Sequence, residues 1–169
     1  LGTSRLDILF VHDIGSMTHG DRHEHYWRQL TEGGGFKALD ELRRDGRISA
    51  IGLGVNEWEV AYDAMQEIAL DCTLLAGRYT LLEQNSLTPF LDACVRDRTS
   101  IVIGGPFNSG VLVGQRKFNY EDAPEEIVRR VEQLEAVCNE FAVPLPAAAL
   151  QFPMAHPAVV SCIPGVRDV

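Results

Sequence analysis

The sequence predicts an α/β fold built on a parallel sheet, because short apolar runs alternate with amphipathic helical patterns along the whole chain. We expect strands in five places: residues 6–11, 48–55, 72–76, 100–104 and 159–163. Several of these runs end in histidine, asparagine or glycine-rich words. That order is typical of a (β/α) barrel, in which the strand ends carry the active site.

A complete (β/α)8 barrel has eight strands in about 250 residues. This chain has 169 residues and about five candidate strands, and its composition does not change along its length. We therefore expect residues 1–169 to form a single domain that is part of a barrel, the C-terminal part of a larger chain. Its two open sheet edges would need partner strands, either the missing N-terminal barrel strands or a partner chain.

The first third of the chain predicts a strand, a loop and a helix. Residues 6–11 read as a parallel strand that is buried on both faces. Residues 14–35 are polar and end in three glycines, so we expect a long lid or binding loop. An apolar stripe at helical spacing follows and stops before a glycine suited to a helix end, at Phe36, Leu39, Leu42 and Gly46.

The middle of the chain continues the alternation. Asn56 follows the strand at 48–55 and is predicted to cap a helix, whose apolar residues are Val60, Ala64 and Ile68. A further helix is expected over residues 86–98, with Ser86 or Thr88 as its cap.

The last third predicts two helices and a strand. Asp122 and Glu125 form a capping-box pattern ahead of a helical stripe at Ile127, Val131, Leu134, Cys138 and Phe141. Pro144 and Pro146 are predicted to end that helix. A second helix is expected over residues 147–154, before the strand at 159–163.

Composition excludes several classes of function. The formal net charge of −9 repels phosphate backbones, so we expect no nucleic acid partner. No apolar stretch approaches the 18 residues or more of a membrane span, so we expect no membrane partner. The four cysteines are widely spaced and form no paired motif, which favours reduced thiols in a cytoplasmic protein.

The words at the strand ends, in this order, resemble the aldo-keto reductases from the fourth barrel strand to just past the eighth. They are Asp7-Ile-Leu-Phe-Val-His-Asp13, Gly52-Leu-Gly-Val-Asn-Glu-Trp58, Gly77-Arg-Tyr-Thr-Leu-Leu82, Gly104-Gly-Pro-Phe-Asn-Ser-Gly110 and Ile163-Pro-Gly165. The resemblance covers essentially the whole chain. It is greatest to the branch that contains the D-threo-aldose (L-fucose) 1-dehydrogenases and pyridoxal 4-dehydrogenase.

The resemblance implies a catalytic role for His12. In the family, the histidine that ends the fourth strand points its ring at the substrate oxygen, where an N–H can steady a developing alkoxide. The alternative is a strand-end histidine that bonds a backbone carbonyl.

The resemblance also implies that Asn56 holds the nicotinamide carboxamide, because an amide can both donate and accept hydrogen bonds. Its alternative role is the helix cap, and one side chain can do both. Val55 departs from the serine that is common in the family, which would remove one contact to the cofactor.

The glycine-rich word after the fourth predicted strand would run along the pyrophosphate, where glycines allow close backbone approach. The cofactor-binding residues implied here are Gly105, Pro106, Phe107, Gly110, Val111 and Leu112. Gly104 stands where many members have a tyrosine stacked on the nicotinamide, and Ala76 where many have a glutamine. The alternative is a simple glycine-rich turn.

The resemblance places Gly165, Val166 and Arg167 on the adenosine side of the cofactor. Many NADPH-preferring members have a lysine at the position of Gly165. Arg167 could supply a cation for a 2′-phosphate or lie on the surface as a solvated residue. We therefore expect NADP or NAD as the cofactor, without choosing between them.

The family's tetrad is aspartate, tyrosine, lysine and histidine, and the chain matches only the histidine. Its four tyrosines do not match the catalytic position. We expect the segment alone to be inactive and the intact protein to be an NAD(P)-dependent aldo-keto reductase that acts on a sugar or an aldehyde. The alternative is a non-catalytic half-barrel that binds or regulates a partner. A lysine or paired carboxylates at the strand ends would indicate other barrel chemistries, and they are absent.

The segment 19–25 contains three histidines with carboxylates between them, a composition that could ligate a metal. It lacks the spacing of known helical zinc motifs and a cysteine partner. We expect it to belong to a solvated, flexible lid loop instead, with no metal bound.

Overall fold

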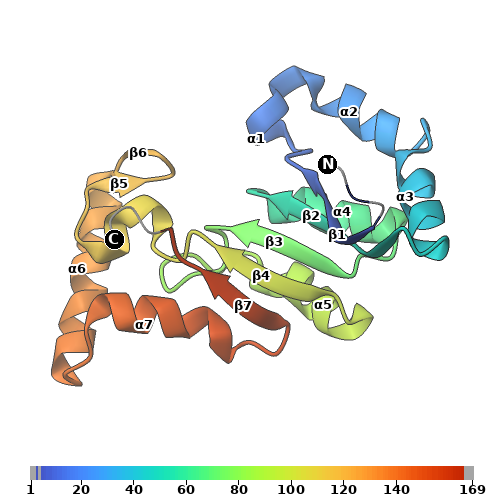
Figure 1. The fold of residues 1–169 in the computed structure, drawn as a ribbon. Coiled ribbons are helices and arrows are strands. Elements are labelled where there is room, and N and C mark those ends of the chain that lie inside the picture. The colour runs from blue at the N-terminus through green and yellow to red at the C-terminus, as the bar shows by residue number, and fades with distance from the viewer. Residues whose placement is uncertain (1–2, 4, 166–169) are drawn as a thin grey trace.

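A computed structural model describes residue 3 and residues 5–165 of the chain. Five parallel strands form one sheet in the order β1-β2-β3-β4-β7, which confirms the predicted α/β fold (Figure 1). These strands are β1 (Leu6–His12), β2 (Ile48–Val55), β3 (Cys72–Ala76), β4 (Ser100–Gly104) and β7 (Val159–Ile163). A separate antiparallel hairpin consists of two strands of two residues each, β5 (Lys117–Phe118) and β6 (Glu121–Asp122).

Helices separate the strands of the sheet, as the sequence predicts. The α-helices are α1 (Ser16–His19), α2 (His23–Leu30), α3 (Gly35–Arg44), α4 (Trp58–Glu67), α5 (Asp92–Asp97), α6 (Glu125–Glu140) and α7 (Leu145–Gln151). Shorter helical turns are η1 (Gly20–Arg22), η2 (Leu87–Leu91), η3 (Asn108–Val113) and η4 (Phe152–Ala155).

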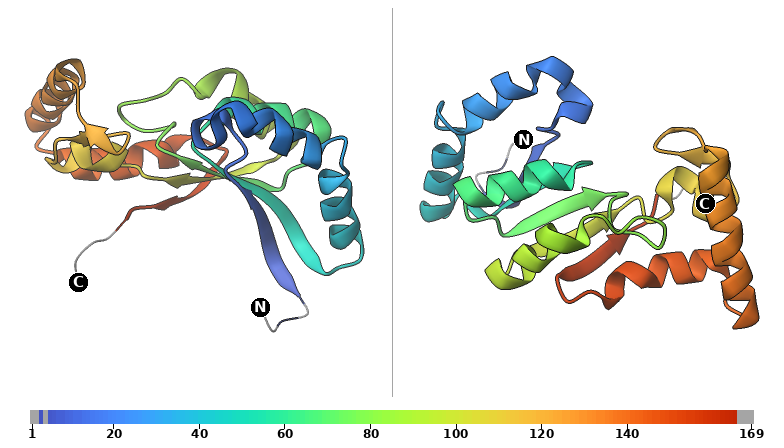
Figure 2. Two further views of the ribbon diagram at one scale, coloured as in Figure 1. Left: turned by 90° about the horizontal axis from the view of Figure 1, so that it is seen from above. Right: turned by 180° about the vertical axis from the view of Figure 1, so that it is seen from behind.

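One face of the sheet packs against helices and forms the larger core. Alternate residues of β2, such as Ile51 and Leu53, are completely buried in it together with Ala61 of α4 and Phe90 of η2. This packing follows from the strand period of two, which directs every second side chain to the same face. Figure 2 shows the same sheet from above and from behind.

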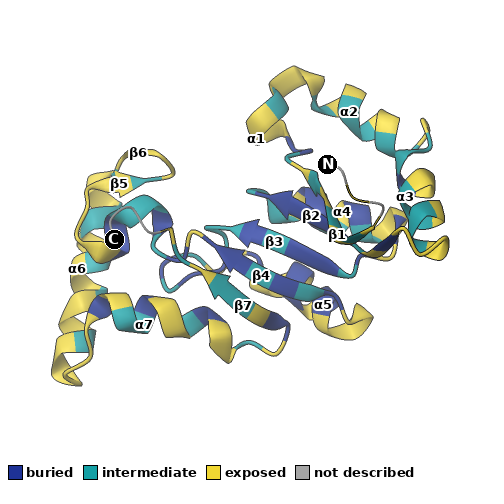
Figure 3. Cartoon of the chain, in the orientation of Figure 1, coloured by how far each residue is buried: buried dark blue, intermediate teal, exposed yellow. Residues whose placement is uncertain are grey.

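The opposite face of the sheet is open in the described part of the chain. Ile8 and Phe10 of β1 are 47% and 36% exposed, and Ile163 of β7 is 51% exposed. Figure 3 shows the exposed positions on these two edge strands. β1 was predicted to be buried on both faces. That prediction is wrong, because Leu6, Leu9 and Val11 pack against the helical core while Ile8 and Phe10 face the open side.

A second, smaller core lies beyond β4. Leu112 of η3 and Ala149 of α7 are completely buried there, and the predicted stripe of α6 packs on them. The stripe residues in contact are Ile127, Val131, Leu134 and Cys138. Phe141, the last residue of the predicted stripe, follows the end of α6 and is exposed.

The predicted loop at 14–35 is wrong. The segment is helical over most of its length, as α1, η1 and α2. Polar composition suggested a loop, but Trp27 and Leu30 form a narrow apolar edge that packs against the core. This edge is enough to hold a helix whose other face is solvated.

Three predicted helix starts also differ from the structure. Glu57 rather than Asn56 precedes α4, and neither side chain caps the helix. α6 begins after Pro124, because Asp122 belongs to β6 and pairs with Lys117. α7 begins at Leu145, two residues before the predicted start, because a proline is tolerated in the first helical turn.

The helix predicted over residues 86–98 is present, but its first turn is the irregular η2.

In the described part of the chain, no helix is long and apolar enough to cross a membrane.

The larger core predicts a specific loss of stability. Leu53→Ala should lower the free energy of unfolding by about 2–5 kcal/mol, because it leaves a cavity in the middle of the sheet. Val95→Ala on α5 is the control, since Val95 is 47% exposed, and it should change stability by about 0.5 kcal/mol or less. Urea unfolding of the intact protein measures both. Equal effects of the two substitutions would contradict the assignment of the core.

Candidate functional site

The carboxyl ends of the parallel strands lie along one edge of the sheet. His12 is opposite Gly54 in the register of β1 and β2, and Ala76 is opposite Gly104 in that of β3 and β4. Gly104 is in turn opposite Ile163 of β7. The loops that follow these strands therefore share one rim, which includes the predicted site positions from residue 12 to residue 165.

His12 ends β1 on the open face of the sheet. Its side chain is 80% exposed, and Nδ1 lies 3.6 Å from Oδ2 of Asp13. A Cβ on Gly54 would lie 3.4 Å from Cδ2 of the ring, so the glycine leaves the ring just enough room. The imidazole is therefore supported on one side by β2 and free to meet a small molecule on the other.

The histidine-rich segment braces the loop that follows His12. A ring nitrogen of His23 lies 2.8 Å from the carbonyl oxygen of Ile14, and His19 bonds the carbonyl of Asp13. The Glu57 carboxylate accepts from the hydroxyl of Ser16 and the N–H of Met17, each at 2.9 Å. Two of the three histidines thus contact backbone oxygens rather than each other.

The residues after β2 and β3 are joined by Arg78. Its Nε donates to the carbonyl oxygen of Asn56 at 2.8 Å, and Nη1 donates to Glu83 at 2.9 Å. Asn56 lines a pocket of about 500 Å³ together with Glu57, Arg78 and Glu83. Asn56, which is predicted to bind the nicotinamide, therefore lies at the rim, and Arg78 holds its backbone carbonyl.

A buried amide joins the loops after β3 and β4. Asn108 is 2% exposed; its Nδ2 donates to the carbonyl of Gly77 at 3.1 Å, and its Oδ1 accepts from Thr80 Oγ1 at 2.6 Å. The same Thr80 oxygen accepts from the N–H groups of Leu82 and Glu83. This arrangement uses the hydroxyl as both donor and acceptor and fixes the two loops against each other.

The loop after β4 forms one wall of a pocket of about 610 Å³. Its lining residues are Gly105, Pro106, Phe107, Ser109, Gly110, Val113, Gln115, Lys117, Tyr120 and Gly165. Among the described lining residues Lys117 is the charged one, and its Nζ lies 2.7 Å from Asp122, whose pKa it lowers by hydrogen bonding. The size lies within the usual range of ligand pockets.

The backbone of this loop has the shape of an anion cradle. Gly105 and Gly110 have φ values of 56° and 105°, and Asn108 and Ser109 between them are also left-handed. Within the described residues, the N–H of Phe107 has no hydrogen-bond acceptor. Consecutive backbone N–H groups in such conformations form concave sites for phosphates. In this loop the N–H groups of Asn108 and Gly110 already bond the carbonyls of Gly105 and Phe107, so the Phe107 N–H is a donor that the loop leaves for an anion.

The structure separates the predicted cofactor residues into groups. Gly105, Pro106, Phe107, Gly110 and Gly165 line the 610 Å³ pocket. The side chains of Val111 and Leu112 point into the smaller core, which leaves only their backbone for a ligand. Val166 and Arg167 lie outside the described residues.

Four positions that the sequence did not single out complete the rim: Arg78, Asn108, Glu57 and Thr80. Arg78, Thr80 and Asn108 occur within the quoted words, but nothing in the spacing indicates hydrogen bonds across 22 to 31 residues of chain. Tyr79, beside them, is buried, and burial raises the pKa of its phenol. A buried phenol with a raised pKa is not poised as a general base near neutral pH.

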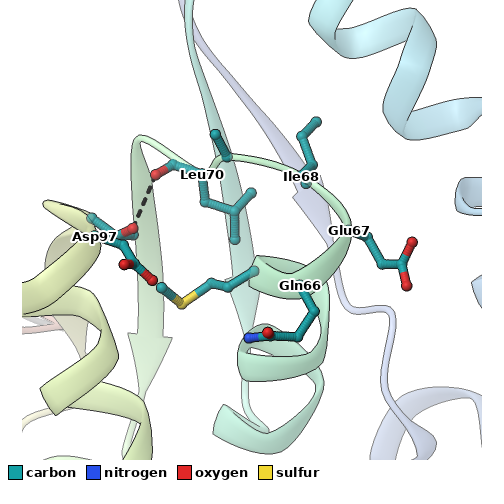
Figure 4. A pocket seen from close by; sticks show the side chains of 8 residues that line it. Gln66, Glu67, Ile68, Leu70 and Asp97 are labelled. Atoms are coloured by element: carbon teal, nitrogen blue, oxygen red, sulfur yellow. Dashed lines mark hydrogen bonds between the residues drawn. The ribbon is translucent and has the colours of Figure 1, made fainter.

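A smaller pocket lies at the opposite edge of the sheet, between the end of α4 and α5 (Figure 4). Its volume is about 290 Å³, and Thr99 Oγ1 donates to the carbonyl of Leu70 at its base. It lies beside the residues that precede β3 and β4, whereas the polar motifs follow the carboxyl ends of the strands. Active sites of parallel α/β folds occur at the carboxyl ends of the strands, so the rim is the better candidate.

Comparison with known proteins identifies a matching family model and two relatives. Residues 1–169 match the family model "Aldo/keto reductase family". The chain is 53% identical over 172 residues to the pyridoxal 4-dehydrogenase of Microbacterium luteolum, covering 99% of this chain and 50% of that protein. It is 37% identical over 170 residues to the D-threo-aldose 1-dehydrogenase of a Pseudomonas species, covering 98% of this chain and 49% of that protein.

Solved structures show the same fold. The holo form of aldo-keto reductase AKR11C1 from Bacillus halodurans matches with a TM-score of 0.65 at 19% identity, over 97% of this chain and 50% of that one. The glycerol dehydrogenase AKR11B4 from Gluconobacter oxydans matches with a TM-score of 0.64 at 15% identity, over 96% of this chain and 50% of that one. The chain thus spans about half the length of the relatives it matches.

The buried hydroxyl of Thr80 predicts a test of the rim. Thr80→Val should destabilise the protein by about 2–3 kcal/mol, because it leaves buried polar partners unsatisfied. Thr73→Val is the matched control: Thr73 is equally buried, and its hydroxyl has no partner among the described residues. The control should leave stability unchanged or slightly raised, as measured by urea unfolding. A smaller loss for Thr80→Val than for Thr73→Val would contradict the buried network.

Proposed function

Because the chain belongs to the aldo/keto reductase family, we propose that it is the cofactor-binding part of an NAD(P)-dependent oxidoreductase. The reaction transfers a hydride between nicotinamide and the carbonyl carbon of an aldehyde or ketone, or the lactol carbon of a sugar. The other half of the barrel, which the relatives possess and this chain does not cover, would supply the aspartate, tyrosine and lysine that the family resemblance implies.

The observation that carries this proposal is the shared rim. A ring nitrogen at the end of β1, an amide after β2 and a left-handed loop after β4 lie along one edge of a parallel sheet. Hydride transfer between two small molecules needs both of them held side by side, with donor and acceptor carbons close together. A rim with separate polar groups for each molecule meets that requirement.

The cofactor would lie across the rim from Asn56 to Gly165. The N–H of Phe107 and the cradle from Gly105 to Gly110 would hold the diphosphate, and Lys117 lines the same pocket. Asn56 would bind the carboxamide, with its backbone already fixed by Arg78. When bound, the nicotinamide accepts or donates the hydride. Val166 and Arg167 would lie on the adenosine side, as the family resemblance implies.

His12 would orient the substrate. Its ring N–H can donate to the substrate oxygen and steady the alkoxide that develops there. In the direction of oxidation, the bound cofactor would take the hydride from the carbon, and the tyrosine supplied by the other half of the barrel would take the proton of the hydroxyl. With a lactol as substrate, the immediate product is a lactone.

The proposed substrates follow from the names of the two relatives, a pyridoxal 4-dehydrogenase and a D-threo-aldose 1-dehydrogenase. The test is a panel of L-fucose, D-arabinose, L-galactose and pyridoxal with the intact protein and each of NAD and NADP, followed by nicotinamide absorbance. Turnover of at least one substrate is expected. No turnover with any pair, together with no binding of either cofactor, would contradict the proposal and favour a non-catalytic half-barrel.

His12 predicts a kinetic result in the intact protein. His12→Ala should lower kcat by about 10-fold or more, the usual scale for a positioned group that shares a proton with the substrate. His25→Ala is the control, because His25 lies on the exposed side of α2 and contacts Gln29. An unchanged kcat in the His12 variant would remove this residue from the mechanism.

A further inference from the structure

Arg78 is the most connected polar side chain of the rim. Besides its bonds to the carbonyl of Asn56 and to Glu83, Nη1 donates to Oδ1 of Asn119 at 3.1 Å, and Nη2 lies 3.9 Å from the sulfur of Met17. These partners belong to different loops. The side chain is 17% exposed, so the guanidinium is largely enclosed among them.

The charge of Arg78 is balanced inside the rim. Glu83 is 22% exposed and lies 2.9 Å from the guanidinium. The Glu83 N–H donates to Thr80 Oγ1, which is part of the network around Asn108. A planar guanidinium can serve several acceptors in fixed directions, which a lysine ammonium cannot do equally well. Arg78 is therefore placed to hold neighbouring loops at fixed positions, unlike a solvated charge on the surface.

The link to Asn119 reaches the far side of the 610 Å³ pocket. Asn119 and Tyr120 form the turn of the β5–β6 hairpin, and both have positive φ values, 49° and 70°. The Tyr120 N–H donates to Ser109 Oγ of the cradle loop at 3.0 Å. Lys117 and Tyr120 line the pocket. The hairpin is therefore attached to the rim by one bond from the cradle and one from Arg78.

Two of the bonds of Arg78 lead to different parts of the proposed cofactor site. One holds the backbone of Asn56, which would bind the nicotinamide end, and the other holds the hairpin beside the diphosphate cradle. We propose that Arg78 is a positioning residue that sets the distance between these two parts and so determines affinity for the dinucleotide. This inference rests on the proposed function, and it assigns Arg78 no part in hydride or proton transfer.

The test separates affinity from chemistry in the intact protein. Arg78→Lys keeps the positive charge but loses the planar guanidinium with its several N–H donors. It should raise the Kd of NAD(H) or NADP(H) by about 5-fold or more. At saturating cofactor, kcat and the KM of the second substrate should stay within about twofold. Backbone amide exchange should rise in residues 117–122 and at Asn56, which a purely remote loss of stability would not produce selectively.

Two variants of Asn119 test the same link without touching the arginine. Asn119→Gly tolerates the left-handed backbone but removes the acceptor, and it should weaken cofactor binding as Arg78→Lys does. Asn119→Asp keeps an acceptor for the guanidinium and should retain most of the wild-type affinity for the cofactor. Arg96→Lys is the matched control, since Arg96 pairs with Asp97 on α5, away from the rim.

The outcomes are distinguishable. A wild-type protein that binds neither cofactor would refute the proposed function and this inference with it. Normal cofactor binding in Arg78→Lys and Asn119→Gly would refute the inference alone. A loss of kcat at unchanged Kd would also refute it, because Arg78 would then act on the chemical step. If Arg78→Lys does not fold, the Asn119 pair decides.

Discussion

The rim depends on one buried contact, the pairing of the Asn108 amide with the Thr80 hydroxyl and the Gly77 carbonyl. Buried polar groups are costly unless each is satisfied, so a complete network holds its loops in a single arrangement. This network fixes the loop after β3 against the left-handed loop after β4. The shape of the loop after β4 follows from it, because Asn108 itself lies in the left-handed run.

The open face of the sheet explains why half a barrel can carry a recognisable site. The helices cover one face, whereas Ile8, Phe10 and Ile163 stay exposed on the other. The chain corresponds to about half of each of the two relatives. Additional strands packed on this face would bury these residues and close the space above His12. The candidate site residues lie along the carboxyl edge of this half of the sheet.

Hydrophobic period predicted the sheet well, because strand and helix faces are determined by burial. The loop prediction for residues 14–35 was wrong because the apolar edge around Trp27 is too narrow to stand out among polar residues. Composition also could not reveal Arg78 or Asn108, since their partners lie far along the chain. Family resemblance and strand-end position predicted His12, Asn56 and the Gly105 loop as site residues, and the register places them at the same edge of the sheet.

The central claim is that one dinucleotide spans the rim from Asn56 to the loop after β4. A crystal structure of the intact protein with its nicotinamide cofactor tests this most directly. The account predicts phosphate oxygens within about 3 Å of the Phe107 N–H and a nicotinamide ring between His12 and Asn56. A cofactor bound elsewhere, or a ring that His12 and Asn56 do not approach, would contradict the account.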